Sequence, residues 1–391
     1  MRQKQPCGSN DRTEEATVRK RSDRAEERPP TPMAARLKSR LPLAVLCALA
    51  VTAGALTYEL HADPTAAQSP DPTARHTRLP SALTDGSGGS GGSGGAAGYR
   101  YDRLTGPDRT VVRDASGAVL ATLTDGARTA VLIGPGRTFA EPRTTKATVA
   151  TDSWVRLLPR PWKRGQEHAK WFADWLRTYR GSRAPDVFEI SMQYVRGAEP
   201  KKNAKGVRYA GDASFGPLNP KGAHGRDLRL EQSDFYQYLG KPWTFPDTGT
   251  AAPQRARYGA VDCSGYVRLV YGYRSGYPLL GSDRKGAGLP RTANGMATVG
   301  PGVTVIANRR ARPAELDALQ PGDLVFFDID RRTGRRLDHS GIYLGLDTDG
   351  HPRFISSREE GDGPTLGDAG GDSRLDGPGY YGKGLRSAKR L

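Results

Sequence analysis

The sequence predicts a mixed α+β protein on three observations. β-Branched runs broken by glycine-containing turns occupy residues 99–160, helical patterns occur within 161–232, and a helix followed by three short strands is predicted near the C-terminus. The chain has 391 residues, enough for two or three domains, and its 36% hydrophobic and 26% charged content fits a soluble protein. A single long apolar run excludes a multi-span membrane protein.

The first 98 residues are predicted to lie outside the folded domains. Residues 1–40 form a charged tail, 41–58 an apolar segment and 59–98 a Pro-, Gly- and Ser-rich flexible linker. Basic residues precede the uncharged run, so 41–58 is either a signal peptide or a single membrane anchor. Translation starts at Met1 or at Met33. Under both alternatives we expect the rest of the chain to be extracellular or in the cell envelope.

The net charge of +17 is unevenly distributed. Residues 1–40 carry +5 and residues 41–98 carry −2, which leaves +14 for the remainder. This excess favours a polyanionic neighbour such as an anionic cell-wall polymer, although solubility alone also accounts for it. Nucleic acid is not expected, because the basic residues are dispersed and no nucleic-acid-binding motif accompanies them.

Residues 99–232 are predicted to form a β-rich domain followed by a helical and loop region. Hairpins within 99–160 suggest either a wall-binding module or a structural unit. In the following region, 161–232, we expect helices over 163–181 and 185–196 and a loop over 203–229. The first helix places Trp171, Trp175 and Tyr179 on one face, which is more typical of a core stripe than of a ligand platform.

The C-terminal region begins with a short helix over 233–239 that Gly240 ends. An amphipathic helix is predicted over 264–275. Three strands are then expected, joined by turns: Leu324–Phe327, Gly341–Leu346 and Arg353–Ser356.

Cys263 is the first candidate catalytic residue. Cys7 and Cys47 precede or lie within the apolar segment, so Cys263 is the one exported cysteine and has no disulfide partner. Asp262 is a favourable N-cap, which places Cys263 at a helix N-terminus, where the helix dipole lowers a thiol pKa. Ser264 is small, so a substrate carbonyl could approach the backbone closely.

His339 is the candidate base, because it stands at the start of a predicted strand. His351 lies in a turn and is expected to be solvated. Asp338 is expected to be a solvated turn carboxylate rather than a triad member, because adjacent strand residues point to opposite faces. His168 and His224 have no partners at metal-ligand spacing, so a zinc hydrolase is disfavoured. No cofactor is expected, because thiol and imidazole suffice.

Four motifs in order resemble the NlpC-type cell-wall cysteine peptidases. They are Asp262-Cys263-Ser264-Gly265, Leu289-Pro290-Arg291, the run Pro321–Phe327 and the run His339–Gly345. The resemblance covers about residues 235–360 and implies a papain-like α+β domain, which we place at 233–391. It implies hydrolysis of peptidoglycan stem peptides, usually between D-γ-glutamate and a diamino acid. Cys263 would be the nucleophile, its amide an oxyanion donor, and His339 the base.

Two positions depart from that family pattern. Ser356 stands where a third polar residue, often histidine, orients the base, and we assign it that role. Trp243 stands where the family commonly has a tyrosine near the free amine of the substrate. With Asp262 and Ser264, Trp243 is therefore a predicted substrate-binding residue.

Three functions remain possible from the sequence. The first is a cysteine endopeptidase that acts on peptidoglycan. The second is a non-catalytic wall-binding or regulatory protein on the same fold, and the third is an acyl or amide transfer enzyme that uses the same dyad. Expected partners are peptidoglycan and anionic wall polymers, with membrane contact only through the N-terminal segment, and we expect a monomer.

Overall fold

A computed structural model describes residues 98–222 and 228–391 of the chain. The predicted tail, the apolar segment and nearly all of the linker lie outside these residues. Within the described part of the chain, no helix has both the length and the apolar character needed to cross a membrane.

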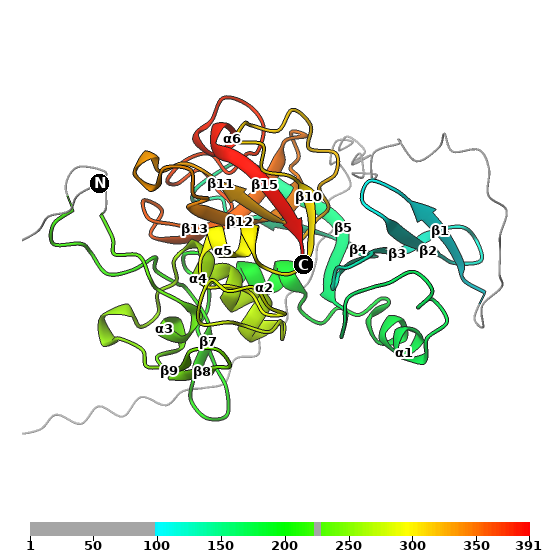
Figure 1. The fold of residues 1–391 in the computed structure, drawn as a ribbon, viewed down its shortest axis with the longest axis horizontal. Coiled ribbons are helices and arrows are strands. Elements are labelled where there is room, and N and C mark those ends of the chain that lie inside the picture. Colours follow the sequence, from blue (N-terminus) through cyan, green and yellow to red (C-terminus); the bar gives the residue numbers. More distant parts are fainter. Residues whose placement is uncertain (1–97, 223–227) are drawn as a thin grey trace, which may run out of the picture. The chain divides into compact units, whose positions relative to one another are not determined.

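The first structural unit is a five-stranded antiparallel sheet in which each strand pairs with the next along the chain (Figure 1). Alternating buried β-branched residues and glycine-containing turns produce this meander, as at Gly126, whose φ is +87°. Its strands are β1 (Arg100–Leu104), β2 (Arg109–Arg113), β3 (Val119–Thr124), β4 (Thr129–Ala140) and β5 (Thr148–Leu157).

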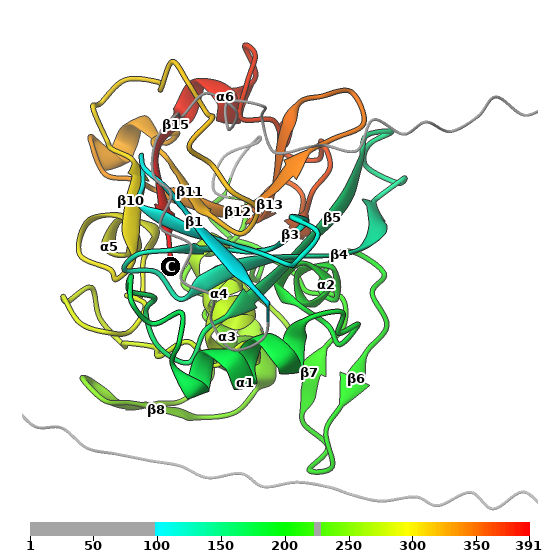
Figure 2. The same cartoon turned by 90° about the vertical axis from the view of Figure 1, so that its right-hand side faces the viewer.

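Helix α1 (Lys170–Tyr179) packs against this sheet (Figure 2). It is shorter than the predicted 163–181, because residues 163–169 form turns instead. Trp175 is buried in a cluster with Trp162 and Phe172, and Trp171 and Tyr179 pack against the same cluster. The aromatic stripe is thus part of a hydrophobic core.

The segment that follows contains short elements. Asp186 caps α2 by accepting a hydrogen bond from the amide of Glu189, and α2 is shorter than the helix predicted over 185–196. A small hairpin reaches into the region expected to be a loop. Helix α3 ends at Gly240, as predicted, and Gly240 has a φ of +61°. The elements are α2 (Val187–Met192), β6 (Lys201–Lys202), β7 (Arg208–Ala210), α3 (Phe235–Leu239), β8 (Trp243–Phe245) and β9 (Gly249–Ala251).

A six-stranded antiparallel sheet forms the centre of the C-terminal domain, in the order β10-β15-β11-β12-β13-β14. The predicted strand Leu324–Phe327 is confirmed, and the other two predicted strands are longer than expected. The last strand, β15, lies between β10 and β11 and was not predicted. The strands are β10 (Val303–Ile306), β11 (Leu324–Phe327), β12 (His339–Leu346), β13 (Pro352–Arg358), β14 (Gly363–Thr365) and β15 (Leu385–Arg390).

Helices cover both faces of this sheet. Helix α4 continues directly into a π-helical segment, and both pack on one face with Phe326, Ile342 and Ile355. Helix α6 packs on the opposite face, where Tyr381 joins Phe327 in a second cluster. The helical elements are α4 (Cys263–Val267), the π-helix Arg268–Arg274, α5 (Ala293–Thr298), α6 (Tyr380–Gly384) and the 3₁₀ turns Arg255–Arg257 and Arg331–Thr333.

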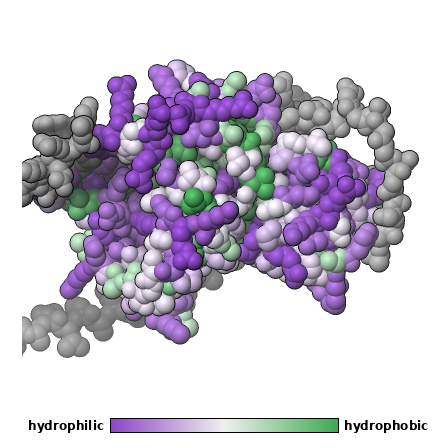
Figure 3. Space-filling view, viewed as in Figure 1, coloured by the Kyte–Doolittle hydropathy of each residue, from purple (hydrophilic) through white to green (hydrophobic). Residues whose placement is uncertain are grey.

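The two sheets share one hydrophobic core. Phe139 and Val155 of the β4–β5 hairpin belong to the same buried cluster as Val267 of α4. The buried carboxylate of Glu141 accepts hydrogen bonds from the hydroxyl of Thr365, the last residue of β14, and from the amide of Leu366. The predicted α+β class is confirmed, with a β-rich region ahead of the C-terminal domain. The face of the molecule seen in Figure 3 is largely hydrophilic.

Candidate active site

Cys263 is the first residue of α4, directly after its N-cap. The side chain of Asp262 accepts a hydrogen bond of 2.7 Å from the amide of Gly265, so the predicted cap is confirmed. The hydroxyl of Ser264 donates to the same carboxylate at 3.0 Å. These two bonds fix the turn that presents the thiol at the helix N-terminus.

The Cys263 thiol is buried against the start of β12. Its Sγ lies 3.8 Å from the main-chain carbonyl oxygen of Asp338, the residue before His339. Burial raises the pKa of this thiol, and the carboxylates of Asp262 and Glu231 raise it further. The expectation that the helix dipole lowers the pKa is therefore corrected, because desolvation and nearby negative charge outweigh it.

His339 is buried and hydrogen-bonded to Ser356. The distance from His339 Nε2 to Ser356 Oγ is 3.0 Å, which joins β12 to β13. Rings of Phe327 and Tyr381 pack beside the imidazole, with centroids 5.7 and 5.1 Å away. Burial lowers the pKa of His339 to about 3, and the Arg358 guanidinium adds to this effect. Among the described residues, the hydrogen bonds of Cys263 do not include one to the imidazole.

The pairing of β12 with β13 stops before the residues that carry these side chains. The two strands pair from Leu346 to Ile342, and β13 pairs with β14 from Ser356 onward. The loop before α4 lies against the opening, where the Ser357 hydroxyl donates to the carbonyl of Val261 at 2.6 Å. Three distant segments thus place Cys263, His339 and Ser356 in one region of the fold.

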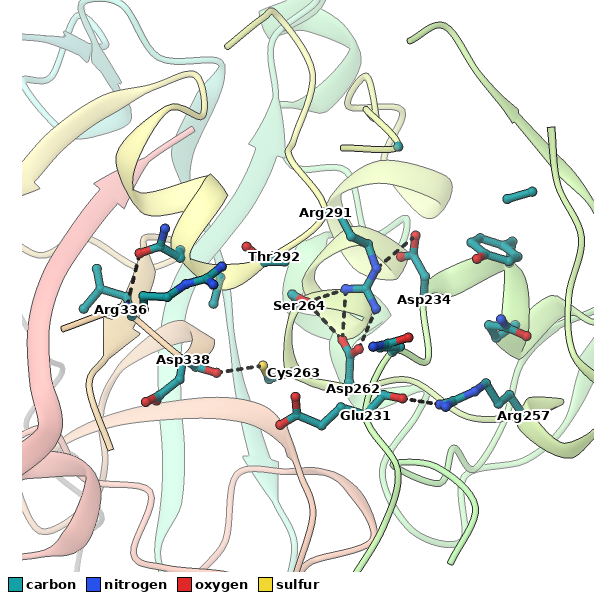
Figure 4. A pocket seen from close by; sticks show the side chains of 18 of the residues that line it. Glu231, Asp234, Arg257, Asp262, Cys263, Ser264, Arg291, Thr292, Arg336 and Asp338 are labelled. Carbon is teal, nitrogen blue, oxygen red and sulfur yellow. Dashed lines mark hydrogen bonds and ion pairs between the residues drawn. The ribbon is translucent and has the colours of Figure 1, made fainter. Parts of the chain in front are cut away.

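A cavity of about 840 Å³ opens beside the thiol (Figure 4). Cys263, Asp262 and Ser264 line it. Its walls carry both signs of charge, which suits a substrate with amine and carboxylate groups. The charged residues that line it are Glu231, Asp234, Arg257, Asp262, Arg291, Arg332, Arg336 and Asp338.

An ion-pair network behind the thiol was not predicted. Arg291 donates to Asp262 at 2.6 Å and to the Ser264 hydroxyl at 2.7 Å. Arg268, which is fully buried, donates to both oxygens of Asp234 at 2.8 and 3.0 Å. Arg291 stands in the motif Leu289-Pro290-Arg291 of the family resemblance, so the sequence did contain a signal for this residue. The pair of Arg268 with Asp234 had no such signal.

Glu231, which also lines the cavity, was missed as well. Partial desolvation within the cavity and the neighbouring carboxylates of Asp262 and Glu359 raise its pKa to about 7, although the residue is exposed to solvent. Nothing in the sequence around Glu231 indicated this, because the three acids come from separate segments.

Three predictions about single residues need correction or qualification. Asp338 is not a simply solvated carboxylate, because it accepts hydrogen bonds from the amides of Ile329 and Asp330. His351 is not simply solvated either, since its Nδ1 lies 2.8 Å from the carboxylate of Asp376. Trp243 is not among the residues that line the cavity. It packs against Phe235 and Tyr273 with ring centroids 5.0 and 6.0 Å away.

One family model matches the part of the chain that contains these motifs. The NlpC/P60 family model matches residues 240–363. A solved lipoprotein-like protein of the NLP/P60 family from Staphylococcus aureus is 17% identical, with a TM-score of 0.23, over 57% of this chain and 50% of that protein. The chain thus spans about half the length of that relative.

A solved NlpC/P60 family protein from Bacillus cereus is 16% identical, with a TM-score of 0.21, over 72% of this chain and 79% of that protein. The curated proteins give no match. The family match covers the cap, the thiol and the strands that carry His339 and Ser356. The C-terminal domain of this chain is thus similar to the NlpC/P60 family, whose model it matches over residues 240–363.

Proposed function

We propose that the protein is a cysteine endopeptidase that cleaves peptidoglycan stem peptides at the bond between D-γ-glutamate and a diamino acid. The match of residues 240–363 to the NlpC/P60 family model supports a role as a cell-wall hydrolase or peptidase. The observation that carries the proposal is the position of the Cys263 thiol, at the wall of a charged cavity and beside the strand that begins with His339.

Each catalytic residue has one task in this proposal. Cys263 attacks the scissile carbonyl carbon and transfers its proton to His339, which then gives it to the leaving amine. Ser356 orients the imidazole through Nε2. The acyl-enzyme is hydrolysed by a water molecule that His339 activates, which restores the thiol.

The surroundings of the thiol supply the substrate contacts. Asp262 and Ser264 lie in the cavity wall and are held in place by Arg291. Trp243, which packs behind this wall, would act by shaping it rather than by contact. The charge of +14 on residues 99–391 favours attraction to anionic wall polymers. We place the enzyme in the cell envelope or outside the cell as a monomer, with 41–58 as its signal or anchor.

Digestion of purified peptidoglycan by the full chain tests the proposal. New stem-peptide fragments identified by mass spectrometry are expected for the wild type and not for Cys263→Ala. Ser275→Ala is a matched control, because its hydroxyl donates to the carbonyl of Val270 away from the cavity. Fragments that persist in Cys263→Ala would contradict the assignment of the nucleophile.

A second candidate, a non-catalytic wall-binding protein, has one observation in its favour. The pKa of Cys263 is raised and that of His339 is lowered to about 3, which opposes a thiolate–imidazolium pair. This candidate predicts that the wild type and Cys263→Ala both sediment with peptidoglycan and that neither releases fragments.

A further inference from the structure

Most charged side chains in the wall of the cavity are already paired within the protein. Asp262 forms an ion pair with Arg291 at 2.6 Å, and Asp234 forms one with Arg268 at 2.8 Å. The carboxylate of Asp338 accepts hydrogen bonds from two main-chain amides of its own loop. These acids and Arg291 therefore have partners without any ligand.

Two of the cations in the wall are engaged as well. Arg257 donates to the carbonyl of Leu230 at 3.1 Å and to the hydroxyl of Ser233 at 3.0 Å. Arg332 pairs with Asp330 at 2.7 Å. Each of these guanidinium groups thus has acceptors that the protein itself supplies.

The two charges that remain in the wall have opposite signs. Among the residues that the structure describes, Glu231 and Arg336 have no ion pair, and their side chains have no hydrogen bond. Glu231 stands beside the carboxylates of Asp262 and Glu359, and this group of acids repels an anion. An anionic group of a ligand in the cavity is therefore directed to Arg336.

The backbone next to Arg336 is held in place. The amide of Leu337 donates to the side-chain oxygen of Asn294 in α5, at 3.2 Å. Asp338 accepts a hydrogen bond of 2.9 Å from the hydroxyl of Thr333, which closes the loop that contains Arg336. The guanidinium of Arg336 thus extends from an anchored position at the cavity wall (Figure 4).

The loop itself adds to the positive charge on this side of the cavity. Residues 331–336 contain four arginines and no acid, so the pair of Arg332 with Asp330 leaves the loop with a net positive charge. The N–H groups of a guanidinium match the two oxygens of a carboxylate, which makes a carboxylate a suitable partner for Arg336.

We propose that Arg336 is a specificity-determining residue that binds a free carboxylate of the stem peptide. The proposal rests on the proposed function, which supplies the substrate. A γ-linked D-glutamate keeps its α-carboxylate free, and the diamino acid at the end of a tripeptide carries a second carboxylate. Conversion of the bound carboxylate to a carboxamide removes its charge, so the protein discriminates against the amidated peptide.

The test measures binding of three synthetic tripeptides to the full chain with Cys263→Ala, by isothermal titration calorimetry. The peptides are L-Ala-γ-D-Glu-L-Lys with both carboxylates free, with the glutamate α-carboxyl amidated, or with the lysine carboxyl amidated. We expect one amidated peptide to bind about tenfold more weakly than the diacid, because a charge-assisted hydrogen bond is lost. The peptide that is weakened identifies which carboxylate Arg336 binds.

Variants of the loop in the same Cys263→Ala chain assign the effect to one side chain. Arg336→Gln is expected to bind the diacid and that amidated peptide equally. Arg336→Lys keeps the charge without the paired donors, so it should retain part of the tenfold difference. Arg335→Gln is the matched control, since it removes the same charge from the same loop at a residue that does not line the cavity, and it should keep the full difference.

Three results would overturn the proposal: no measurable binding of the diacid, equal binding of all three peptides, or a tenfold difference that persists in Arg336→Gln. Binding is read without turnover, so the two proposals fail separately. If the wild type digests no peptidoglycan while Arg336 discriminates between the peptides, the peptidase falls and the carboxylate site stands. Digestion without discrimination removes the role of Arg336 and leaves the peptidase.

Discussion

At the residue scale, Asp262 connects the stability of the site to its reactivity. Its carboxylate caps α4, pairs with Arg291 and raises the pKa of the Cys263 thiol. Because the pair is nearly buried, the charge on each partner depends on the other.

Substitution of Asp262 with asparagine should therefore have two opposite effects. We expect the free energy of unfolding to fall by about 3 kcal/mol, because Arg291 loses its main charged partner. The alkylation rate of Cys263 in the folded variant should rise, because a negative charge beside the thiol is gone. Urea denaturation and alkylation kinetics measure these effects. Asp330→Asn, which breaks an exposed pair with Arg332, should cost less than about 1 kcal/mol.

His339 predicts how stability depends on pH. Its pKa is about 3 in the folded protein, below the ordinary value of 6.5, so the unfolded chain binds a proton first as pH falls. The contribution of His339 to the free energy of unfolding is complete above pH 6.5 and is lost as the pH falls towards 3. From pH 6.5 to 4.5 we expect a loss of about 2–3 kcal/mol that is absent in His339→Gln, measured by urea denaturation.

The comparison with His339→Gln is needed because Glu231 has the opposite effect. The pKa of Glu231 is raised from 4.5 to about 7. Its contribution to the free energy of unfolding is therefore lost as the pH rises from 4.5 to about 7. Both proteins contain Glu231, so the difference between them isolates the histidine. Equal losses in the two proteins would contradict the buried, neutral His339.

At the element scale, the loop between β11 and β12 is held by one carboxylate. Asp338 accepts hydrogen bonds from the amides of Ile329 and Asp330 and from the hydroxyl of Thr333. The loop also places Arg336 at the cavity wall (Figure 4). Its shape therefore depends on a residue adjacent to the proposed base.

Asp338→Asn should loosen this loop locally. An amide oxygen is a weaker acceptor than a carboxylate, so each lost charge-assisted bond should cost about 1–3 kcal/mol of local stability. We expect faster hydrogen exchange at residues 329–333, measured by mass spectrometry, and little change in β13. Exchange that accelerates equally throughout the C-terminal domain would show that Asp338 supports the whole domain instead.

At the scale of the whole molecule, Arg390 joins the two sheets. It lies in β15, where it donates to both oxygens of Asp323, each at 2.8 Å, and to the hydroxyl of Thr124 in β3 at 2.9 Å. The shared core around Val155 and Val267 reinforces this link. The β-rich region and the C-terminal domain should therefore unfold together.

Arg390→Gln tests this coupling. We expect a loss of about 3–5 kcal/mol, because Asp323 is left buried and unpaired. In the wild type, tryptophan fluorescence and protection of Cys263 from alkylation should change at the same urea concentration. Arg386→Gln, in the same strand, should cost less, since Arg386 is 3.6 Å from a partly exposed Asp328. Separate transitions in the wild type would contradict the coupling.

Local sequence was sufficient for much of the C-terminal domain. The helix ended by Gly240, the strand Leu324–Phe327 and the cap at Asp262 depend on neighbours within a few residues, so pattern and capping rules predicted them. The same holds for the aromatic stripe of α1. The insertion of β15 between β10 and β11 was not predictable in this way, because it depends on pairing between distant segments.

The residues of the candidate site divide in the same manner. By itself, the sequence determined the α+β class, the NlpC/P60 motifs and the candidates Cys263 and His339, because each is encoded in a short run. Only the tertiary structure decided the electrostatic environment of Cys263 and His339. Burial raises the thiol pKa, and Arg358, remote from Cys263 along the chain, lies behind Ser356. Desolvation and long-range contacts exist only once the chain has folded.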